Sequence, residues 1–382
     1  MTKFNETIPL SLYIHLPWCI KKCPYCDFNS HTQGDTLPEA EYVDRLIEEF
    51  EAQLPHIWGR RLTSIFIGGG TPSLFSADAL DRLLSAINAR LPFANNLEIT
   101  LEANPGTAEA ERFKRYREIG INRLSIGIQS FNDTHLKTLG RIHGSDEAKA
   151  AIGFARDAGF DNFNLDLMFA LPNQTIEEAL ADIQTAIDFE PKHISWYQLT
   201  IEPNTLFHHN PPPLPSDDES WELQTQGVKL LDEHGYKQYE VSAYCREENH
   251  CKHNRNYWEF GDYLGIGAGS HSKITHMDLQ QVIRHWNVKN PKDYLNTEKA
   301  FVANQHILTQ DDLPLEFMLN ALRLKEGVPA SLYTERTGLD LESIEELLQK
   351  AKHKKLLLSD QDVIKPTALG ERFLNDLVTL FL

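Results

Sequence analysis

The sequence predicts an α/β protein whose main body is a partial barrel of six parallel strands, a (β/α)6 arrangement, followed by a small winged-helix-like C-terminal helical domain. Three observations predict it. Short β-rich runs alternate with longer amphipathic segments from residue 11 to about residue 200. Glycine or polar residues lie at or near the ends of the expected strands. The pattern changes to short helices after about residue 300. A closed eight-stranded barrel would need two more strand–helix units.

The expected strands are short apolar runs, and an amphipathic helix follows most of them. The strands are Ser11–Leu16, Ser64–Gly68, Leu97–Glu102, Arg123–Gln129, Phe163–Ala170 and His193–Ile201. In the helices apolar residues recur every three or four positions. The helices are Glu39–Leu54, Ala77–Leu91, Ala108–Ile119, Asp146–Ala158 and Ile176–Phe189. Strands that alternate with helices in this way are typical of a parallel sheet.

Four of these helices follow a residue that can cap a helix N-terminus, namely Ser76, Thr107, Ser145 and Thr175. Downstream, a proline-rich loop precedes a helix over Trp221–Glu233 and a strand over Tyr239–Ala243. We therefore expect a partial barrel over residues 1–205, an extension over 206–300 and a helical domain over 301–382. The last domain is either a packing module or a nucleic-acid-binding winged helix, and the acidic composition favours the packing module.

Composition restricts the class of protein. The chain has 382 residues and a formal net charge of −18, which disfavours nonspecific binding to nucleic acid or to anionic membranes. Three of its five cysteines fall within eight residues, which is not a disulfide framework and indicates a reducing compartment. The N-terminus lacks a signal-peptide pattern, and no apolar run reaches the roughly 20 residues of a membrane span. We expect a cytoplasmic protein.

Cys19, Cys23 and Cys26 form a C-x3-C-x2-C pattern directly after the first expected strand. Thiolates suit iron–sulfur clusters and zinc. A structural zinc site takes four ligands, whereas three thiolates on one loop leave one iron of a [4Fe-4S] cluster open for another ligand. A zinc knuckle that borrows a histidine such as His15, or three free thiols, are the alternatives.

The other strand ends carry glycine and polar side chains. FIGGGTPSLF contains Gly69, Gly70 and Thr71, and its glycines permit close backbone approach to a small ligand. No Lys-Ser/Thr pair follows, so this is not a P-loop. Four further strings carry polar residues: Glu102 in LEANPG, Gln129 in SIGIQSF, Asp166 in NLDLMFALP and Arg141 in LKTLGRIH. Each has an ordinary structural explanation as a cap, ion pair or buried polar group, but together they indicate a ligand site.

These strings, together with YIHLPWCIKKCPYCDFNSH, resemble the oxygen-independent coproporphyrinogen III oxidase-like group of radical S-adenosylmethionine (SAM) proteins, and within it the HemW type of heme chaperone. The resemblance implies Cys19, Cys23 and Cys26 as ligands of a [4Fe-4S] cluster. It also implies one-electron reduction of the cluster and homolysis of SAM. The residues it places around SAM are Tyr13, Tyr25, Gly69, Gly70, Thr71, Glu102, Gln129, Arg141 and Asp166.

Two features separate the subgroups. The oxidases resemble C-x3-C-x2-C-x-C, and Phe28 stands where the additional cysteine would be. The string HNRNYW matches the HNxxYW pattern of the chaperone type, in which His253 would contact heme iron. Cys251 is a rival ligand, and a surface loop packed on the barrel is the alternative. Gly265, Gly267 and Gly269 follow at alternate positions, which suits close approach to a ligand that the sequence does not identify.

We therefore expect a chaperone that binds a [4Fe-4S] cluster, SAM and heme and delivers heme to target proteins such as respiratory enzymes. The alternatives are coproporphyrinogen III dehydrogenase and a radical SAM methyltransferase or mutase acting on another tetrapyrrole. The expected partners are heme and heme-accepting proteins, with no nucleic acid, no integral membrane segment and only peripheral membrane contact through partners. The resemblance also suggests a homodimer that forms as the cluster assembles.

Overall fold

The computed structural model describes residues 2–106 and 109–382, and within them a sheet of twelve strands forms the main body. Its middle consists of six parallel strands that are neighbours both along the chain and in the sheet. They are β1 (Leu10–Leu16), β4 (Leu62–Gly69), β5 (Phe93–Ala103), β6 (Arg123–Gln129), β7 (Phe163–Phe169) and β8 (His193–Gln198). The predicted α/β class and the six parallel strands are confirmed.

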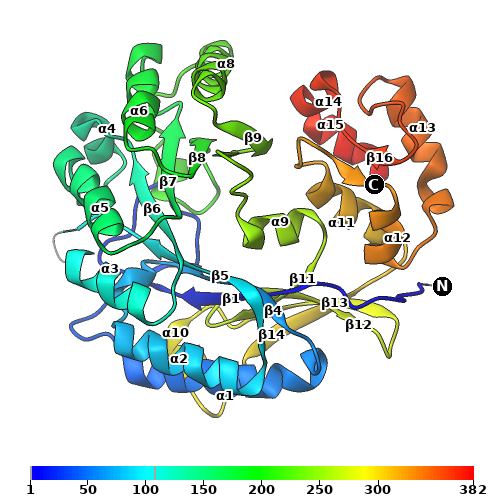
Figure 1. Cartoon of the computed structure of the whole chain (residues 1–382), viewed down its shortest axis with the longest axis horizontal. Helices are drawn as coiled ribbons and strands as arrows, with labels where there is room; N and C mark the ends of the chain where they lie inside the picture. Colours follow the sequence, from blue (N-terminus) through cyan, green and yellow to red (C-terminus); the bar gives the residue numbers. More distant parts are fainter. Residues whose placement is uncertain (1, 107–108) are drawn as a thin grey trace.

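The helices between these strands cover the outer, convex face of the curved sheet, as Figure 1 shows. They are α1 (Glu39–Ile57), α2 (Ala77–Arg90), α3 (Glu109–Glu118), α5 (Ser145–Asp157) and α6 (Ile176–Asp188). Their apolar sides and the outward side chains of the strands form the main hydrophobic core. A short helix that the sequence did not predict, α4 (Asp133–Thr138), precedes α5.

The predicted helix caps have different outcomes. The Ser76 hydroxyl accepts a hydrogen bond from the Ala79 amide at 3.2 Å, and the Thr175 hydroxyl accepts one from the Glu178 amide at 3.2 Å. The prediction for Ser145 is wrong, because α5 begins one residue earlier than expected and Gly144 occupies the capping position. Thr107 lies outside the described residues.

The sheet continues beyond β1 with strands from the second half of the chain. β11 (Asp262–Ile266) pairs with β1 in parallel, and β12 (His271–His276), β13 (Gln281–Asn287) and β14 (Val302–Leu308) follow antiparallel. At the opposite edge α8 (Asp217–Glu233) precedes β9 (Lys237–Glu240) and β10 (Ala243–Cys245). The predicted single strand over Tyr239–Ala243 is wrong, because the chain reverses there and β9 and β10 pair antiparallel.

The C-terminal residues form a separate apolar cluster of short helices. These are α11 (Asp312–Ala321), α12 (Ser331–Thr337), α13 (Glu345–His353), α14 (Ala368–Arg372) and α15 (Leu374–Val378), with the strand pair β15 (Val328–Pro329) and β16 (Val363–Ile364). Phe4 and Ile8 from the N-terminal segment also pack in this cluster. The division at residues 205 and 300 stays a prediction. Among the described helices, none has both the length and the apolar character to cross a bilayer.

Candidate functional site

The cysteine loop follows β1 and is closed by its own backbone. Two short strands, β2 (Trp18–Cys19) and β3 (His31–Thr32), pair in parallel at the two ends of the loop. Within it the Cys26 amide donates a hydrogen bond to the Cys23 carbonyl at 3.2 Å. All three cysteines carry free thiols, with Cys19 buried and Cys23 and Cys26 half-buried. Because both ends of the loop are paired, the three sulfur atoms lie on one restrained segment.

The surroundings of the thiols fit a cationic metal cluster. Burial raises the pKa of the Cys19 and Cys26 thiols, so their thiolates need a nearby positive charge. The Arg141 guanidinium lies 3.7 Å from the Cys23 sulfur. In residues 2–106 and 109–382 no three His, Cys, Asp or Glu side chains stand close enough to hold a single metal ion. A cluster takes each thiolate at a different iron, so its ligands can stand further apart.

His15, the histidine of the zinc alternative, has other partners. One ring nitrogen lies 3.0 Å from the Tyr13 hydroxyl, and the other lies 2.9 Å from the Asn29 carbonyl oxygen. Burial lowers the pKa of His15 to about 4 and keeps the ring neutral. Zinc coordination by His15 would break one of these two hydrogen bonds, which counts against the zinc knuckle.

The glycine turn after β4 packs directly on the cysteine loop. The Gly70 amide donates to the Leu16 carbonyl at 2.8 Å, and the Thr71 amide donates to the Trp18 carbonyl at 2.7 Å. Gly69 has φ +118°, a conformation that L side chains rarely adopt, and its amide donates to Glu102 Oε2 at 3.0 Å. The turn therefore connects the end of β4 to the cysteine loop and to the tip of β5.

Two half-buried carboxylates, Glu102 and Asp166, lie inside the strand array. Burial, with the nearby charge of Asp166, raises the pKa of Glu102 to about 8. Burial also raises the pKa of Asp166, although Ser125 donates to it at 2.9 Å and Asn164 donates to it at 2.8 Å. A ligand with a cationic group and hydroxyl donors would stabilise both carboxylates in the ionised state, and SAM has an ammonium, a sulfonium and a ribose.

Arg141, Gln129 and Tyr25 lie beside the cysteine loop. The Arg141 guanidinium donates to Asn104 Oδ1 at 2.6 Å and to the Gly127 carbonyl at 2.7 Å. Gln129 is the last residue of β6, and its φ of 71° is a strained conformation for any residue other than glycine. Its side-chain oxygen accepts a hydrogen bond from the Tyr197 hydroxyl at 2.7 Å. Burial raises the pKa of Tyr25, and the nearby charge of Arg141 opposes this rise.

The structure adds two residues that sequence reasoning missed. Asn104 donates to the Thr71 hydroxyl at 3.0 Å and accepts from Arg141, so it links the glycine turn to the arginine. Its place directly after the Glu102 strand end was the available signal. Tyr197 comes from the interior of β8, where an aromatic residue in a buried strand gives no signal of its own.

The HNxxYW segment is a helix, α9 (Lys252–Trp258), rather than an exposed loop. His253 is 1 % exposed, and its ring nitrogens lie 3.2 Å from Ser64 Oγ and 2.9 Å from Tyr257 Oη. Burial lowers the pKa of His253 to about 3. His253 is therefore not accessible, because α9 packs on β4 and β1 and buries the ring. Cys251 is buried as well, with its sulfur 3.7 Å from Glu98.

A cavity of about 800 Å³ opens between the cysteine loop, the β11–β13 strands, α9 and α11, and we call it the rim cavity. Its lining includes three histidines (His15, His31 and His271) and four cationic side chains (Lys22, Lys273, Arg284 and Lys289). Aromatic side chains supply much of the remaining wall, among them Tyr13, Phe28, Tyr257, Trp258, Phe260 and Tyr263. This volume and mixture of apolar walls with polar groups are typical of a small-molecule site.

Two of the alternating glycines pack against the cysteine loop. A Cβ at Gly267 would meet the His15 carbonyl, and one at Gly269 would meet the Asn29 side chain. Asn29 Nδ2 also donates to the Ala268 carbonyl at 2.8 Å. The glycines thus allow the strand end after β11 to pack against the cysteine loop, and Gly269 lies in the wall of the rim cavity.

Comparison with known proteins identifies the family. The model of the radical SAM superfamily matches residues 13–186, and that of the HemN C-terminal domain matches residues 308–373. A Haemophilus influenzae protein named heme chaperone HemW is 50% identical over 378 residues, with 98% of each chain covered. The chain belongs to the HemW family. An Escherichia coli protein of the same name is 48% identical over 374 residues, again with 98% of each chain covered.

A solved structure has the same fold. An Escherichia coli coproporphyrinogen III oxidase, HemN, described as a radical SAM enzyme, aligns with a TM-score of 0.82 and covers 98% of this chain and 90% of its own. Its sequence is 23% identical, so this likeness concerns the fold alone. This HemW-family chain therefore has the α/β radical SAM fold with a HemN-type C-terminal domain.

Proposed function

We propose that this HemW-family protein is a heme chaperone that binds a [4Fe-4S] cluster, SAM and heme, and delivers heme to target proteins such as respiratory enzymes. The observation that carries the proposal is the match over 98% of both chains, at 50% and 48% identity, to two proteins named heme chaperone HemW. Heme is the cargo of this function, whereas the cluster and SAM are its cofactors.

The site supports the cofactor part of the proposal. Cys19, Cys23 and Cys26 would hold the cluster, and Arg141 beside Cys23 would stabilise the thiolate charge. The residues that would contact SAM are Tyr13, Tyr25, Gly69, Gly70, Thr71, Glu102, Gln129, Arg141 and Asp166. When bound, the cluster and SAM would supply one-electron chemistry, while the chain binds them, orients them and excludes water.

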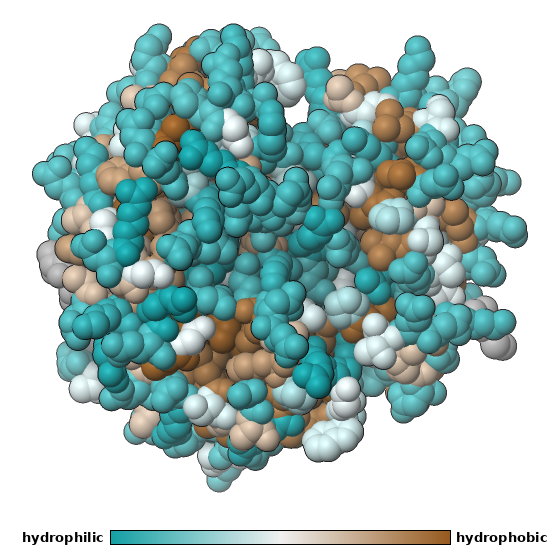
Figure 2. Space-filling model, viewed as in Figure 1, coloured by the Kyte–Doolittle hydropathy of each residue, from teal (hydrophilic) through white to brown (hydrophobic). Residues whose placement is uncertain are grey.

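We infer that heme delivery takes place in the cytoplasm, because closely spaced free cysteines suit a reducing compartment. The polar surface supports delivery to a protein partner. Figure 2 shows hydrophilic side chains over most of one face of the molecule, and the formal net charge is −18. Such a surface favours contact with a complementary protein over contact with nucleic acid. A homodimer formed during cluster assembly is part of the proposal, and sedimentation of the protein with and without its cluster tests it.

Phe28 separates the proposal from the dehydrogenase alternative. Its side chain is 60% exposed and lines the rim cavity, at the position where the oxidase pattern has a further cysteine. A phenyl ring can provide an apolar wall for a porphyrin but neither a thiolate ligand nor a proton.

The deciding experiment is an anaerobic reaction of the cluster-reconstituted protein with reductant, SAM and coproporphyrinogen III, followed by mass spectrometry. In parallel, heme binding is measured by absorbance titration. We expect heme binding without loss of carboxyl groups from the porphyrinogen. Loss of two carboxyl groups would establish the dehydrogenase, and absence of heme binding would refute the chaperone.

A further inference from the structure

One histidine of the rim cavity, His271, has no hydrogen-bond partner for its ring nitrogens among the residues that the structure describes. His15 is bonded to Tyr13 and Asn29, and His31 Nε2 lies 3.2 Å from Asn29 Oδ1. His271 is exposed at the start of β12, and no hydrogen bond joins its ring to another side chain in the described part of the chain. It stacks on Trp286 with 6.1 Å between ring centroids and 22° between planes. An oriented imidazole with a free nitrogen is a ready ligand for iron.

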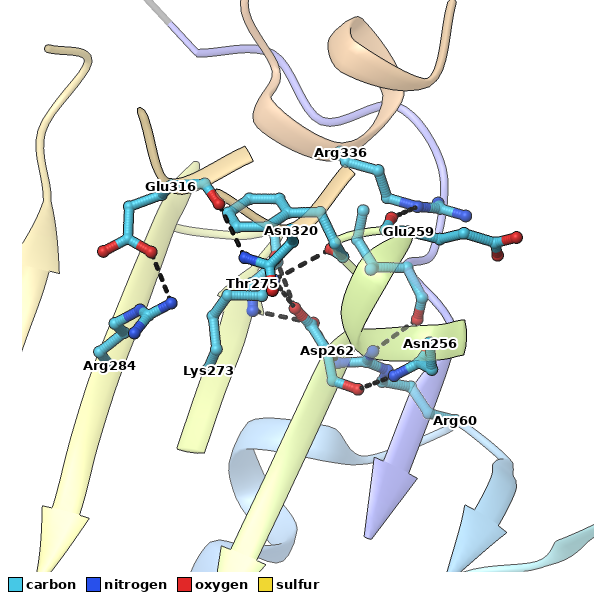
Figure 3. A network of polar contacts seen from close by, with 12 residues as sticks. Arg60, Asn256, Glu259, Asp262, Lys273, Thr275, Arg284, Glu316, Asn320 and Arg336 are labelled. Carbon is cyan, nitrogen blue, oxygen red and sulfur yellow. Dashed lines mark hydrogen bonds and ion pairs between the residues drawn. The ribbon is translucent and has the colours of Figure 1, made fainter. Parts of the chain in front are cut away.

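Two of the four cations that line the cavity have no carboxylate partner in the part of the chain that the structure describes. Arg284 forms an ion pair with Glu316 at 2.5 Å, and Lys273 forms one with Asp262 at 3.0 Å, both visible in Figure 3. Lys22 Nζ donates to the carbonyls of Phe28 and Ser30, at 3.2 and 3.4 Å, and has no ion-pair partner within residues 2–106 and 109–382. Lys289 is exposed, and its ammonium forms no ion pair among the residues that the structure describes. Two unpaired ammonium groups at one opening stand out in a chain of net charge −18.

The walls of the cavity suit a flat, largely apolar ligand. Tyr257 and Trp258 come from α9, Tyr263 from β11 and Phe28 from the cysteine loop. Tyr257 and Tyr263 meet edge to face, with 4.6 Å between their ring centroids. Aromatic faces of this kind pack well on a planar macrocycle. The aromatic residues of the HNxxYW segment therefore reach the cavity, although its histidine is buried behind them.

We propose that the rim cavity holds heme with the imidazole of His271 on the iron and with Lys22 and Lys289 paired to its two propionates. The inference rests on the proposed heme-chaperone function and names the site at which that function would bind its cargo. It differs from the sequence prediction, in which His253 is the iron contact. Coordination by His253 would break its bonds to Ser64 and Tyr257 and open α9, whereas His271 needs no such change.

The iron ligand is tested by titrating heme into the full-length protein and recording resonance Raman and electron paramagnetic resonance spectra. His271→Ala should weaken heme binding at least about tenfold, since ligation worth more than about 1.4 kcal/mol is lost. It should also remove the histidine-ligated signature. His353→Ala, at an exposed histidine of the C-terminal domain, is the matched control and should leave both unchanged. Circular dichroism and cluster content report whether each variant remains folded.

The outcomes separate the two proposals. If the unaltered protein binds no heme, the proposed function itself fails. If it binds heme and His271→Ala keeps the same affinity and spectra, the inference is overturned while the function stands. A loss of the histidine signature in His253→Gln but not in His271→Ala would return the iron contact to His253.

The propionate contacts are tested with heme and its dimethyl ester, which lacks the two negative charges. Lys22→Ala and Lys289→Ala should each weaken binding of heme about two- to fivefold, as expected for partly exposed charge pairs, and leave the ester unaffected. The effect should shrink as salt is raised. Lys354→Ala, in the C-terminal domain, is the control. Equal weakening of heme and ester, or no weakening of either, would refute the assigned propionate contacts.

Discussion

The three cysteines are positioned by backbone contacts on both sides of their loop. The β2–β3 pairing closes the loop, and the amides of Gly70 and Thr71 bind carbonyls of Leu16 and Trp18. Asn29 attaches the same loop to the strand end after β11. Backbone hydrogen bonds of this kind hold a loop whether or not its thiols are ligated. The residue-scale predictions therefore separate ligation from loop geometry.

Removal of a single thiol tests ligation. Cys19→Ala, Cys23→Ala and Cys26→Ala should each abolish [4Fe-4S] assembly almost completely, because a cubane with one accessible iron needs the three remaining thiolates. The control is Cys245→Ala, which removes a buried free thiol on β10 outside the loop and should retain the full cluster. Iron, sulfide and zinc analysis after anaerobic reconstitution makes the measurement. Zinc bound in place of iron and sulfide would support the zinc knuckle.

A methyl group at Gly70 tests loop geometry. A Cβ there would overlap the carbonyl oxygen and carbonyl carbon of Trp18. These are backbone atoms and cannot rotate away. We expect Gly70→Ala to destabilise the protein by about 2 kcal/mol and to lower the iron content after reconstitution. Gly153→Ala, where nothing lies within 4 Å in α5, should stabilise by about 0.5–1 kcal/mol. Urea unfolding measures both, and equal effects of the two changes would contradict the packing argument.

At the scale of elements, one carboxylate joins α1 to the second half of the sheet. Glu49 is fully buried and accepts hydrogen bonds from the Gly267 amide at 2.8 Å, from Asn287 Nδ2 at 2.5 Å and from the Tyr294 hydroxyl at 2.5 Å. These donors lie after β11, at the end of β13 and in α10 (Pro291–Leu295). Burial nevertheless raises the pKa of Glu49 from 4.5 to about 7.

This raised pKa predicts a pH dependence of stability. Between pH 4.5 and about pH 7 the folded protein binds a proton at Glu49 that the unfolded chain has released, so stability falls as pH rises through this window. The stabilisation that proton binding at Glu49 gives the folded protein is fully present below pH 4.5. It amounts to at most about 3 kcal/mol of the free energy of unfolding. Urea unfolding across this range should show it in the wild type and in Glu51→Gln, which alters a surface pair with Arg90, but not in Glu49→Gln. If the free energies of unfolding of the wild type and of Glu49→Gln differed by the same amount at every pH, the prediction would be contradicted.

At the scale of the whole molecule, a buried polar network joins the main sheet, α9 and the C-terminal domain (Figure 3). Asp262 at the start of β11 accepts from Lys273 Nζ at 3.0 Å and from Arg60 Nη1 at 3.0 Å. Burial tends to raise the pKa of Asp262, but these two cations hold it below its usual range. Asn256 of α9 donates to the Asp262 carbonyl at 2.8 Å, and Arg336 of α12 donates to the Glu259 carbonyl at 3.3 Å.

Loss of the central charge should destabilise the whole chain. Asp262→Asn would leave two buried cations without a carboxylate, and we expect a loss of about 3–5 kcal/mol in the free energy of unfolding. Asp293→Asn, which breaks a surface pair with Lys299, should cost less than about 1 kcal/mol. Lys273→Met combined with Asp262→Asn should recover part of the loss, since it removes one uncompensated charge. Equal effects of the two single changes would show that burial does not strengthen the network.

The sequence by itself determined the strand–helix alternation, the positions of the six parallel strands and the family. Each of these depends on local apolar periodicity or on a short motif. Such patterns can be recognised in the sequence because they involve residues that are close together along the chain. The cysteine spacing and the polar residues at strand ends likewise placed the candidate cofactor site, because the carboxyl ends of parallel strands meet at one edge. The split of Tyr239–Ala243 into two strands was missed because a reversal without glycine or proline leaves little local trace.

Only the tertiary structure decided which polar residues are accessible. The HNxxYW pattern drew attention to His253, yet α9 buries this histidine against Ser64, whereas His271, which no motif marks, lines the rim cavity. Asn104 and Tyr197 belong to the site because they contact residues that are distant along the chain. Burial and hydrogen-bond partners depend on which distant segments pack together, and no local pattern of residues contains that information.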